Sequence, residues 1–171
     1  MPGLTPSWGG VLAEAASVCL KGEEHSRLVE LRVDGTFDET LTLKRFGVTL
    51  RMLLSHHDEE EATEMGACGI AILALQNLAN VVVVRRARKG MGFDYWLGPS
   101  EGSLLQQAEH LEVSGIRNGS EAAVKARFLE KARQTQKFHT TTPTWVAVVE
   151  FSRPMLRLVK LSRPDLRIVK S

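Results

Sequence analysis

Apolar and polar side chains alternate over residues 27–33 and again over residues 36–46, which is the period of half-buried β-strands. Asp34 and Gly35 lie between the two segments, and this dipeptide favours a two-residue hairpin turn. Helix-favouring apolar residues over 8–20 precede the hairpin. The pattern therefore predicts an N-terminal helix followed by a β-hairpin.

The middle of the chain predicts a helix, three strands, a second helix and a fourth strand. A short helix over about 48–55 leads to the acidic run 58–61, whose negative charge suits the start of a long helix ending near Leu78. The segments expected to follow are strands over 81–86, 93–97 and 111–116, a helix over 121–137 and a strand over 144–151.

The C-terminal segment contains a short internal repeat. Residues 152–160 (SRPMLRLVK) return as residues 162–170 (SRPDLRIVK). Two copies are too few for a solenoid, which needs at least three units to bury a continuous core. We expect two short strands or an extended tail, whose basic side chains either contact phosphates or keep an edge strand soluble.

Length and composition indicate one α/β domain over residues 1–171. The chain has 171 residues, of which 43% are hydrophobic, enough to bury one core. We divide it into an N-terminal elaboration (1–57), a core (58–151) and a basic C-terminal segment (152–171). Because the net charge is only +2, any affinity for nucleic acid must come from local clusters. One such cluster comprises Arg85, Arg86, Arg88 and Lys89.

Cysteine usage and hydropathy point to a soluble cytoplasmic protein. Cys19 and Cys68 lie far apart and lack the spacing of a zinc site or a disulfide framework. The most apolar stretch, residues 66–84, is interrupted by Gln76, Asn77 and Asn80, so we expect no membrane span. The N-terminus has no basic segment followed by an apolar core, so no signal peptide is expected.

Two carboxylates carry the candidate chemistry, because Asp94 and Glu112 lie in predicted strands among bulky apolar residues. A buried carboxylate is unfavourable unless a cation or hydrogen bonds compensate it. Two carboxylates on adjacent strands would offer the oxygen ligands that Mg²⁺ requires. Glu112 and Ser114 share one strand face, and Glu64 heads the helix row predicted to face the sheet.

In this order of elements and acids the chain resembles the restriction-endonuclease-like superfamily, whose nuclease motif is written PD-(D/E)-x-K. The resemblance covers about residues 58–151. It assigns Asp94 to the first acidic position, Glu112 to the second and Glu64 to the helix acid of many members. Ser114 stands where the family has its motif lysine, which orients the attacking water and stabilises the charge of the transition state.

Some members with a substituted motif lysine take a basic residue from the following helix, and Lys125 is the candidate here. Its side chain would lie on the helix face that carries Ala122, Phe128 and Leu129. The alternative is an ordinary i,i+4 pair between Lys125 and Glu121.

The resemblance implies a magnesium- or manganese-dependent endonuclease that acts on DNA in preference to RNA. A second reading keeps the fold without catalysis, as a module that binds nucleic acid or a protein partner in a defence or regulatory assembly. A third is a structural α/β protein whose acids pair with arginines. A small domain without a separate recognition module would need a symmetric partner to cut both strands, so we expect a homodimer.

Overall fold

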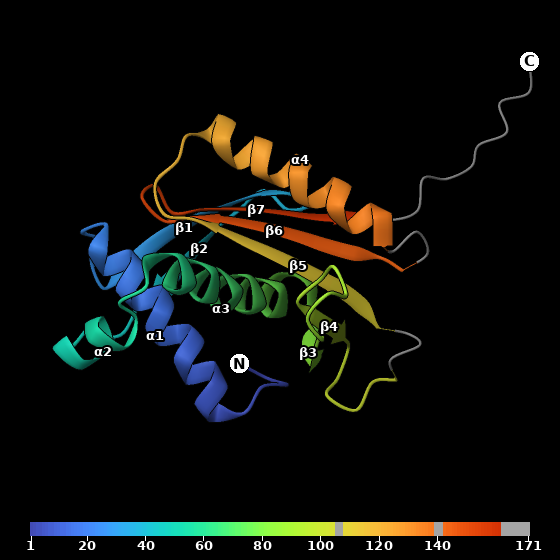
Figure 1. Cartoon of the computed structure of the whole chain (residues 1–171), viewed down its shortest axis with the longest axis horizontal. Coiled ribbons are helices and arrows are strands. Elements are labelled where there is room, and N and C mark those ends of the chain that lie inside the picture. Colours follow the sequence, from blue (N-terminus) through green and yellow to red (C-terminus); the bar gives the residue numbers. More distant parts are fainter. Residues whose placement is uncertain (105–107, 139–141, 162–171) are drawn as a thin grey trace, which may run out of the picture.

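The computed structural model describes residues 1–104, 108–138 and 142–161. Within them the chain forms four helices and one mixed seven-stranded sheet (Figure 1). In chain order the elements are α1 (Pro6–Gly22), β1 (Leu28–Gly35), β2 (Glu39–Lys44), α2 (Leu50–Ser55), α3 (Glu59–Ala79), β3 (Val82–Arg86), β4 (Tyr95–Gly98), β5 (Glu109–Ile116), α4 (Glu121–Phe138), β6 (Thr144–Glu150) and β7 (Met155–Leu161). The strand order is β2-β1-β7-β6-β5-β4-β3.

The sheet separates two layers of helices, with α1 and α3 on one face and α4 on the other (Figure 1). The larger apolar cluster joins α1 and α3 to the sheet through residues such as Leu75, Leu111 and Leu156. The smaller cluster joins Phe128 of α4 to Val146 and other residues of β6. Every residue of β6 is buried, as expected for a strand covered on both faces.

Small residues allow α1 and α3 to pack closely. A side chain added at Gly66 of α3 would place its Cβ 2.9 Å from the Ala16 backbone of α1. Helix α3 is long and apolar enough to cross a membrane by length and composition alone. It lies mostly buried between α1 and the sheet, which is the position of a core helix in a soluble protein.

The predicted hairpin exists, but its turn lies elsewhere. β1 and β2 are antiparallel with Val33 opposite Glu39, so the chain turns after Gly35 and not at it. Asp34 and Gly35 belong to β1 because β7 pairs in parallel with that end of the strand. The Arg157 Nη1 atom of β7 lies 2.8 Å from Asp34 Oδ2. A strand distant in sequence thus extends β1 through the expected turn.

The order helix, three strands, helix, strand over residues 58–151 is confirmed. The first copy of the C-terminal repeat forms β7, inserted between β6 and β1. It is therefore an interior strand, so the expectation that it serves as a soluble edge strand is wrong. The second copy, residues 162–170, lies outside the described residues.

Candidate functional site

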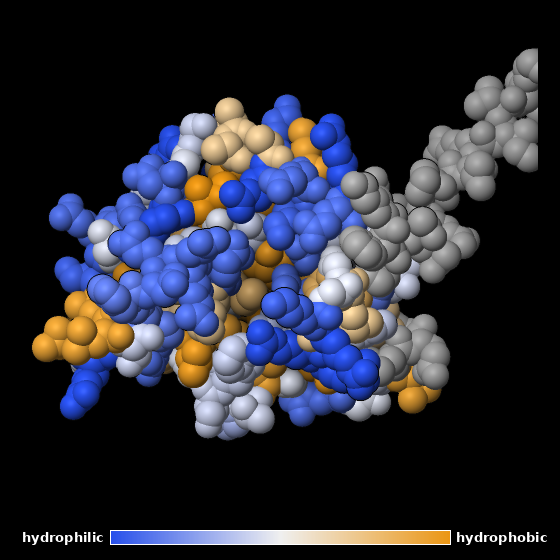
Figure 2. All heavy atoms as spheres, viewed as in Figure 1, coloured by the Kyte–Doolittle hydropathy of each residue, from blue (hydrophilic) through white to orange (hydrophobic). Residues whose placement is uncertain are grey.

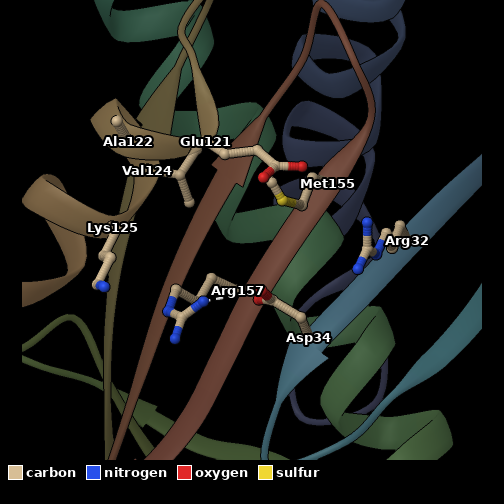
Figure 3. A pocket seen from close by; sticks show the side chains of 8 residues that line it. All are labelled: Arg32, Asp34, Glu121, Ala122, Val124, Lys125, Met155 and Arg157. Carbon is tan, nitrogen blue, oxygen red and sulfur yellow. Dashed lines mark hydrogen bonds and ion pairs between the residues drawn. The ribbon is translucent and has the colours of Figure 1, made fainter.

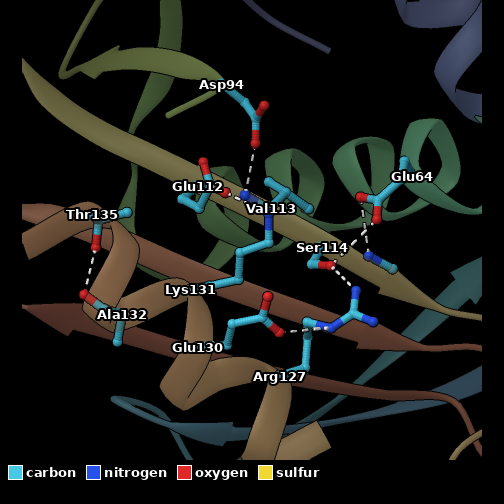
Figure 4. Close-up of polar contacts among 11 residues, drawn as sticks. Glu64, Asp94, Glu112, Val113, Ser114, Arg127, Glu130, Lys131, Ala132 and Thr135 are labelled. Atoms are coloured by element: carbon cyan, nitrogen blue, oxygen red, sulfur yellow. Dashed lines mark hydrogen bonds and ion pairs between the residues drawn. The ribbon is translucent and has the colours of Figure 1, made fainter. Parts of the chain in front are cut away.

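The site forms where β4 and β5 stop pairing. β4 pairs with β5 only as far as Leu111, and an unpaired backbone N–H needs another acceptor. The Val113 N–H donates to Asp94 Oδ2 at 2.8 Å, and the Gly115 N–H donates to Glu64 Oε2 at 3.2 Å (Figure 4). Asp94, in the loop before β4, and Glu64, on α3, therefore accept hydrogen bonds from alternate backbone amides on the same edge of β5.

Glu112 directly precedes Val113 in sequence, and its side chain faces α4. Its side chain is only 5% exposed, and its Oε1 atom accepts a hydrogen bond from Lys131 Nζ at 2.8 Å. Lys131 is held there because its neighbour Ala132 and the preceding Phe128 pack α4 onto the sheet. A buried carboxylate thus meets a cation supplied by the helix, as a buried charge requires.

A cleft of about 710 Å³ opens above this pair of strands. It is lined on one side by Asp94, Glu112 and Lys131, and on the other by the basic loop that follows β3. Three of the four predicted basic residues line it: Arg86, Arg88 and Lys89. Arg85 does not, and its guanidinium lies 5.8 Å from the centroid of the Trp96 ring. Acidic and basic groups therefore share one cavity.

Burial dominates the electrostatics of the three carboxylates. Burial and the nearby Asp94 charge raise the pKa of Glu112 from 4.5 to about 7, against the opposing effect of Lys131. Burial also raises the pKa of Asp94, although the Val113 N–H and Lys131 act against it. The pKa of Glu64 is raised by burial as well, opposed by its bond from Gly115. A cation bound in the cleft would favour the ionised carboxylates and so lower their pKa values.

Burial lowers the pKa of Lys131, but its hydrogen bond to Glu112 and the surrounding carboxylate charges outweigh that effect. The pKa of Lys131 is therefore raised above its ordinary value of 10.5. Lys131 stays protonated at neutral pH, so the cleft keeps one fixed positive charge beside its two acids.

The donor atoms fit a hard divalent cation at a site of two carboxylates. Asp94 Oδ1 and Glu112 Oε2 accept no hydrogen bond from the described residues, and Mg²⁺ binds through one or two carboxylates with water and phosphate completing its shell. Among residues 1–104, 108–138 and 142–161, no three His, Cys, Asp or Glu side chains are grouped to hold a metal ion. The expected three-carboxylate set is not formed.

Glu64 is directed away from the cleft. Its two oxygens bind Ser114 Oγ and the Gly115 amide, and it lines a separate hollow beside Arg117 and Arg127. Ser114 is fully buried and accepts a hydrogen bond from Arg127 Nη1 at 2.9 Å (Figure 4). The structure gives Glu64 and Ser114 a role in joining α3, β5 and α4, and brings only Asp94 and Glu112 together in the cleft.

Lys125 does not reach the carboxylates. Its side chain is exposed and lines a hollow of about 270 Å³ on the other flank of α4, near the Arg157–Asp34 ion pair (Figure 3). The basic residues that do face β5 are Arg127 and Lys131, which sequence reasoning missed. Each precedes a residue of the buried row formed by Val124, Phe128 and Ala132. This spacing places both residues on one flank of the row but does not indicate that this flank faces β5.

No protein-family model, curated protein or solved structure matches this chain. What is established is an α/β protein with a mixed seven-stranded sheet and four helices in its described residues. The resemblance to the restriction-endonuclease-like superfamily stays a prediction, carried by element order and by the residues of the cleft.

Proposed function

We propose that this protein is a metal-dependent nuclease of restriction-endonuclease-like fold that hydrolyses phosphodiester bonds, with DNA as the preferred substrate. One observation carries the proposal. The half-buried carboxylate of Asp94 and the buried carboxylate of Glu112 share a cleft with Lys131 and with three basic residues at the end of β3 and in the loop after it. Basic residues bind a phosphate backbone, and paired acids bind the divalent cation that phosphodiester hydrolysis uses.

Each group has a distinct role in this proposal. Arg86, Arg88 and Lys89 hold the phosphate backbone across the cleft. Asp94 and Glu112 would hold Mg²⁺ or Mn²⁺ through the carboxylate oxygens that accept no hydrogen bond from the described residues. When bound, such a metal lowers the pKa of a coordinated water and neutralises phosphate charge.

Lys131 takes the place of the motif lysine. Its protonated amine lies 2.8 Å from Glu112, in the cleft that would hold the scissile phosphate. A preorganised cation at such a position stabilises the transition state.

We place the protein in the reducing cytoplasm, in keeping with its free cysteines Cys19 and Cys68.

A binding module without catalysis is the second candidate, and the position of Ser114 favours it. The motif-lysine position holds a neutral hydroxyl that is already bonded to Glu64 and Arg127. In this case the basic loop still binds nucleic acid or an acidic protein partner in a defence or regulatory assembly. The Glu112–Lys131 ion pair would then be structural.

Calorimetric titration with Mg²⁺ and Mn²⁺, paired with cleavage of plasmid and single-stranded DNA, separates the two candidates. The nuclease proposal expects metal binding that is lost in Asp94→Asn, and cleavage that is lost in both Asp94→Asn and Lys131→Met. Lys125→Met is the matched control, because it removes an exposed lysine of the same helix outside the cleft. Nucleic-acid binding without metal binding or cleavage would support the second candidate.

A further inference from the structure

The short helix α2 exposes its apolar side chains to solvent. None of its residues is buried, and Leu50, Leu53 and Leu54 are 70%, 45% and 61% exposed. Phe46, just before the helix, is 51% exposed. Figure 2 shows an orange, hydrophobic projection at the end of the molecule where Figure 1 places α2.

The spacing of these leucines makes the exposed face continuous. Residues at i, i+3 and i+4 of a helix lie on one side, so Leu50, Leu53 and Leu54 form a single apolar stripe. Met52, on the inward side, is only half-buried. An isolated helix of this length is not stable by itself, and α2 covers no core of its own chain. Its leucines therefore have the pattern of a contact surface.

Side chains of opposite charge lie near the two ends of α2. Arg51 is exposed on α2 and makes no ion pair with the described residues. The start of α3 presents the exposed residues Glu59, Glu60 and Glu61, which also form no ion pair in the described part of the chain. The acidic run follows the C-terminal end of α2, whereas Arg51 lies near its N-terminal end.

We propose that two copies of this chain associate about a twofold axis through the surface formed by Phe46, Leu50, Leu53 and Leu54. A twofold contact uses the same patch on both protomers. Antiparallel packing of the two α2 helices covers the leucines of each. It also brings Arg51 of one protomer toward Glu59 and Glu60 of the other. The acidic run beside the patch disfavours the alternative of an anionic lipid surface.

The proposal does not rest on the nuclease function, so it is tested without metal or nucleic acid. Sedimentation velocity and light scattering on the full chain at micromolar concentration should give a dimer. The double variant Leu50→Asp/Leu54→Asp should be monomeric with an unchanged circular dichroism spectrum, because neither leucine is buried. Leu129→Asp, which changes an exposed leucine of α4, is the matched control and should stay dimeric.

A charge exchange tests the orientation independently. Arg51→Glu alone and Glu59→Arg/Glu60→Arg alone should each weaken the dimer about tenfold or more, and the three substitutions combined should recover most of that loss. A wild-type monomer across the concentration range, or a dimer that survives the double leucine variant, would overturn the proposal. Failure of the combined charge variant to recover association would overturn the antiparallel arrangement.

Discussion

Glu112→Gln offers the most direct test of the electrostatic cost of burying the ionised Glu112 carboxylate in the cleft. The substitution keeps the shape of a side chain that is 5% exposed and removes its charge. In the wild-type protein, burial and Asp94 raise the pKa of Glu112 from 4.5 to about 7. Glutamine has no such titration, so the two proteins should differ in how their stability depends on pH.

The direction of the effect follows from proton binding. Below pH 4.5 Glu112 is protonated in both the folded and the unfolded state. Between pH 4.5 and about 7 the unfolded chain has released the proton that the folded protein still holds, so stability falls as pH rises. At about 1.4 kcal/mol for each pKa unit, the rise in the pKa of Glu112 corresponds to about 3.5 kcal/mol of unfolding free energy.

Urea unfolding of both proteins from pH 5 to pH 8 measures this difference. The free energy of unfolding of Glu112→Gln, relative to wild type, should increase by about 2.5 kcal/mol across that range. The absolute offset between the proteins also contains the cost of leaving Lys131 without its partner, but that offset does not follow the titration of Glu112. Parallel pH profiles would refute the assignment of a strained carboxylate at this position.

Three further variants test the packing and the basic loop. Gly115→Ala would put a Cβ 2.5 Å from the Thr63 carbonyl oxygen and should destabilise the fold by about 1–3 kcal/mol in urea, whereas Gly10→Ala, with open space around it, should not. Leu156→Ala removes a fully buried side chain and should lower the unfolding free energy by about 2–5 kcal/mol, measured in the same way. Arg88→Gln/Lys89→Gln should weaken DNA binding and reduce the slope of log K against log salt by about 2; an unchanged slope in fluorescence anisotropy would remove these residues from the interface.

Periodicity located the elements because it is a local property. The buried row Ala67, Ala71 and Leu75 predicted α3, and the alternation of Leu31 and Val33 predicted β1. Pairing between strands is non-local and could not be predicted in this way. The insertion of β7 beside β1 joins Asp34 to Arg157, and no pattern near Asp34 indicates that a later strand will occupy the expected turn.

The candidate site was predicted in part, for a similar reason. Asp94 and Glu112 were found because charged residues within apolar strands stand out in the sequence. The phase of α4 relative to β5 decides which lysine reaches them, and that phase depends on how Val124 and Phe128 pack against β6 and β7. Lys125 and Lys131 lie on opposite flanks of the buried row, so they could not be ranked before the packing was known.

Ser114 and the two basic residues of α4 that face β5 are best understood together. Ser114 is fully buried, and its hydroxyl lies 2.9 Å from Arg127 Nη1. A lysine at this position would put another positive charge into a buried region that Arg127 already occupies, and buried like charges repel strongly. Once α4 supplies Lys131 to Glu112, a small hydroxyl on β5 is the side chain that leaves room for Arg127. In the proposed nuclease, the cation beside the carboxylates would therefore come from α4 and not from β5.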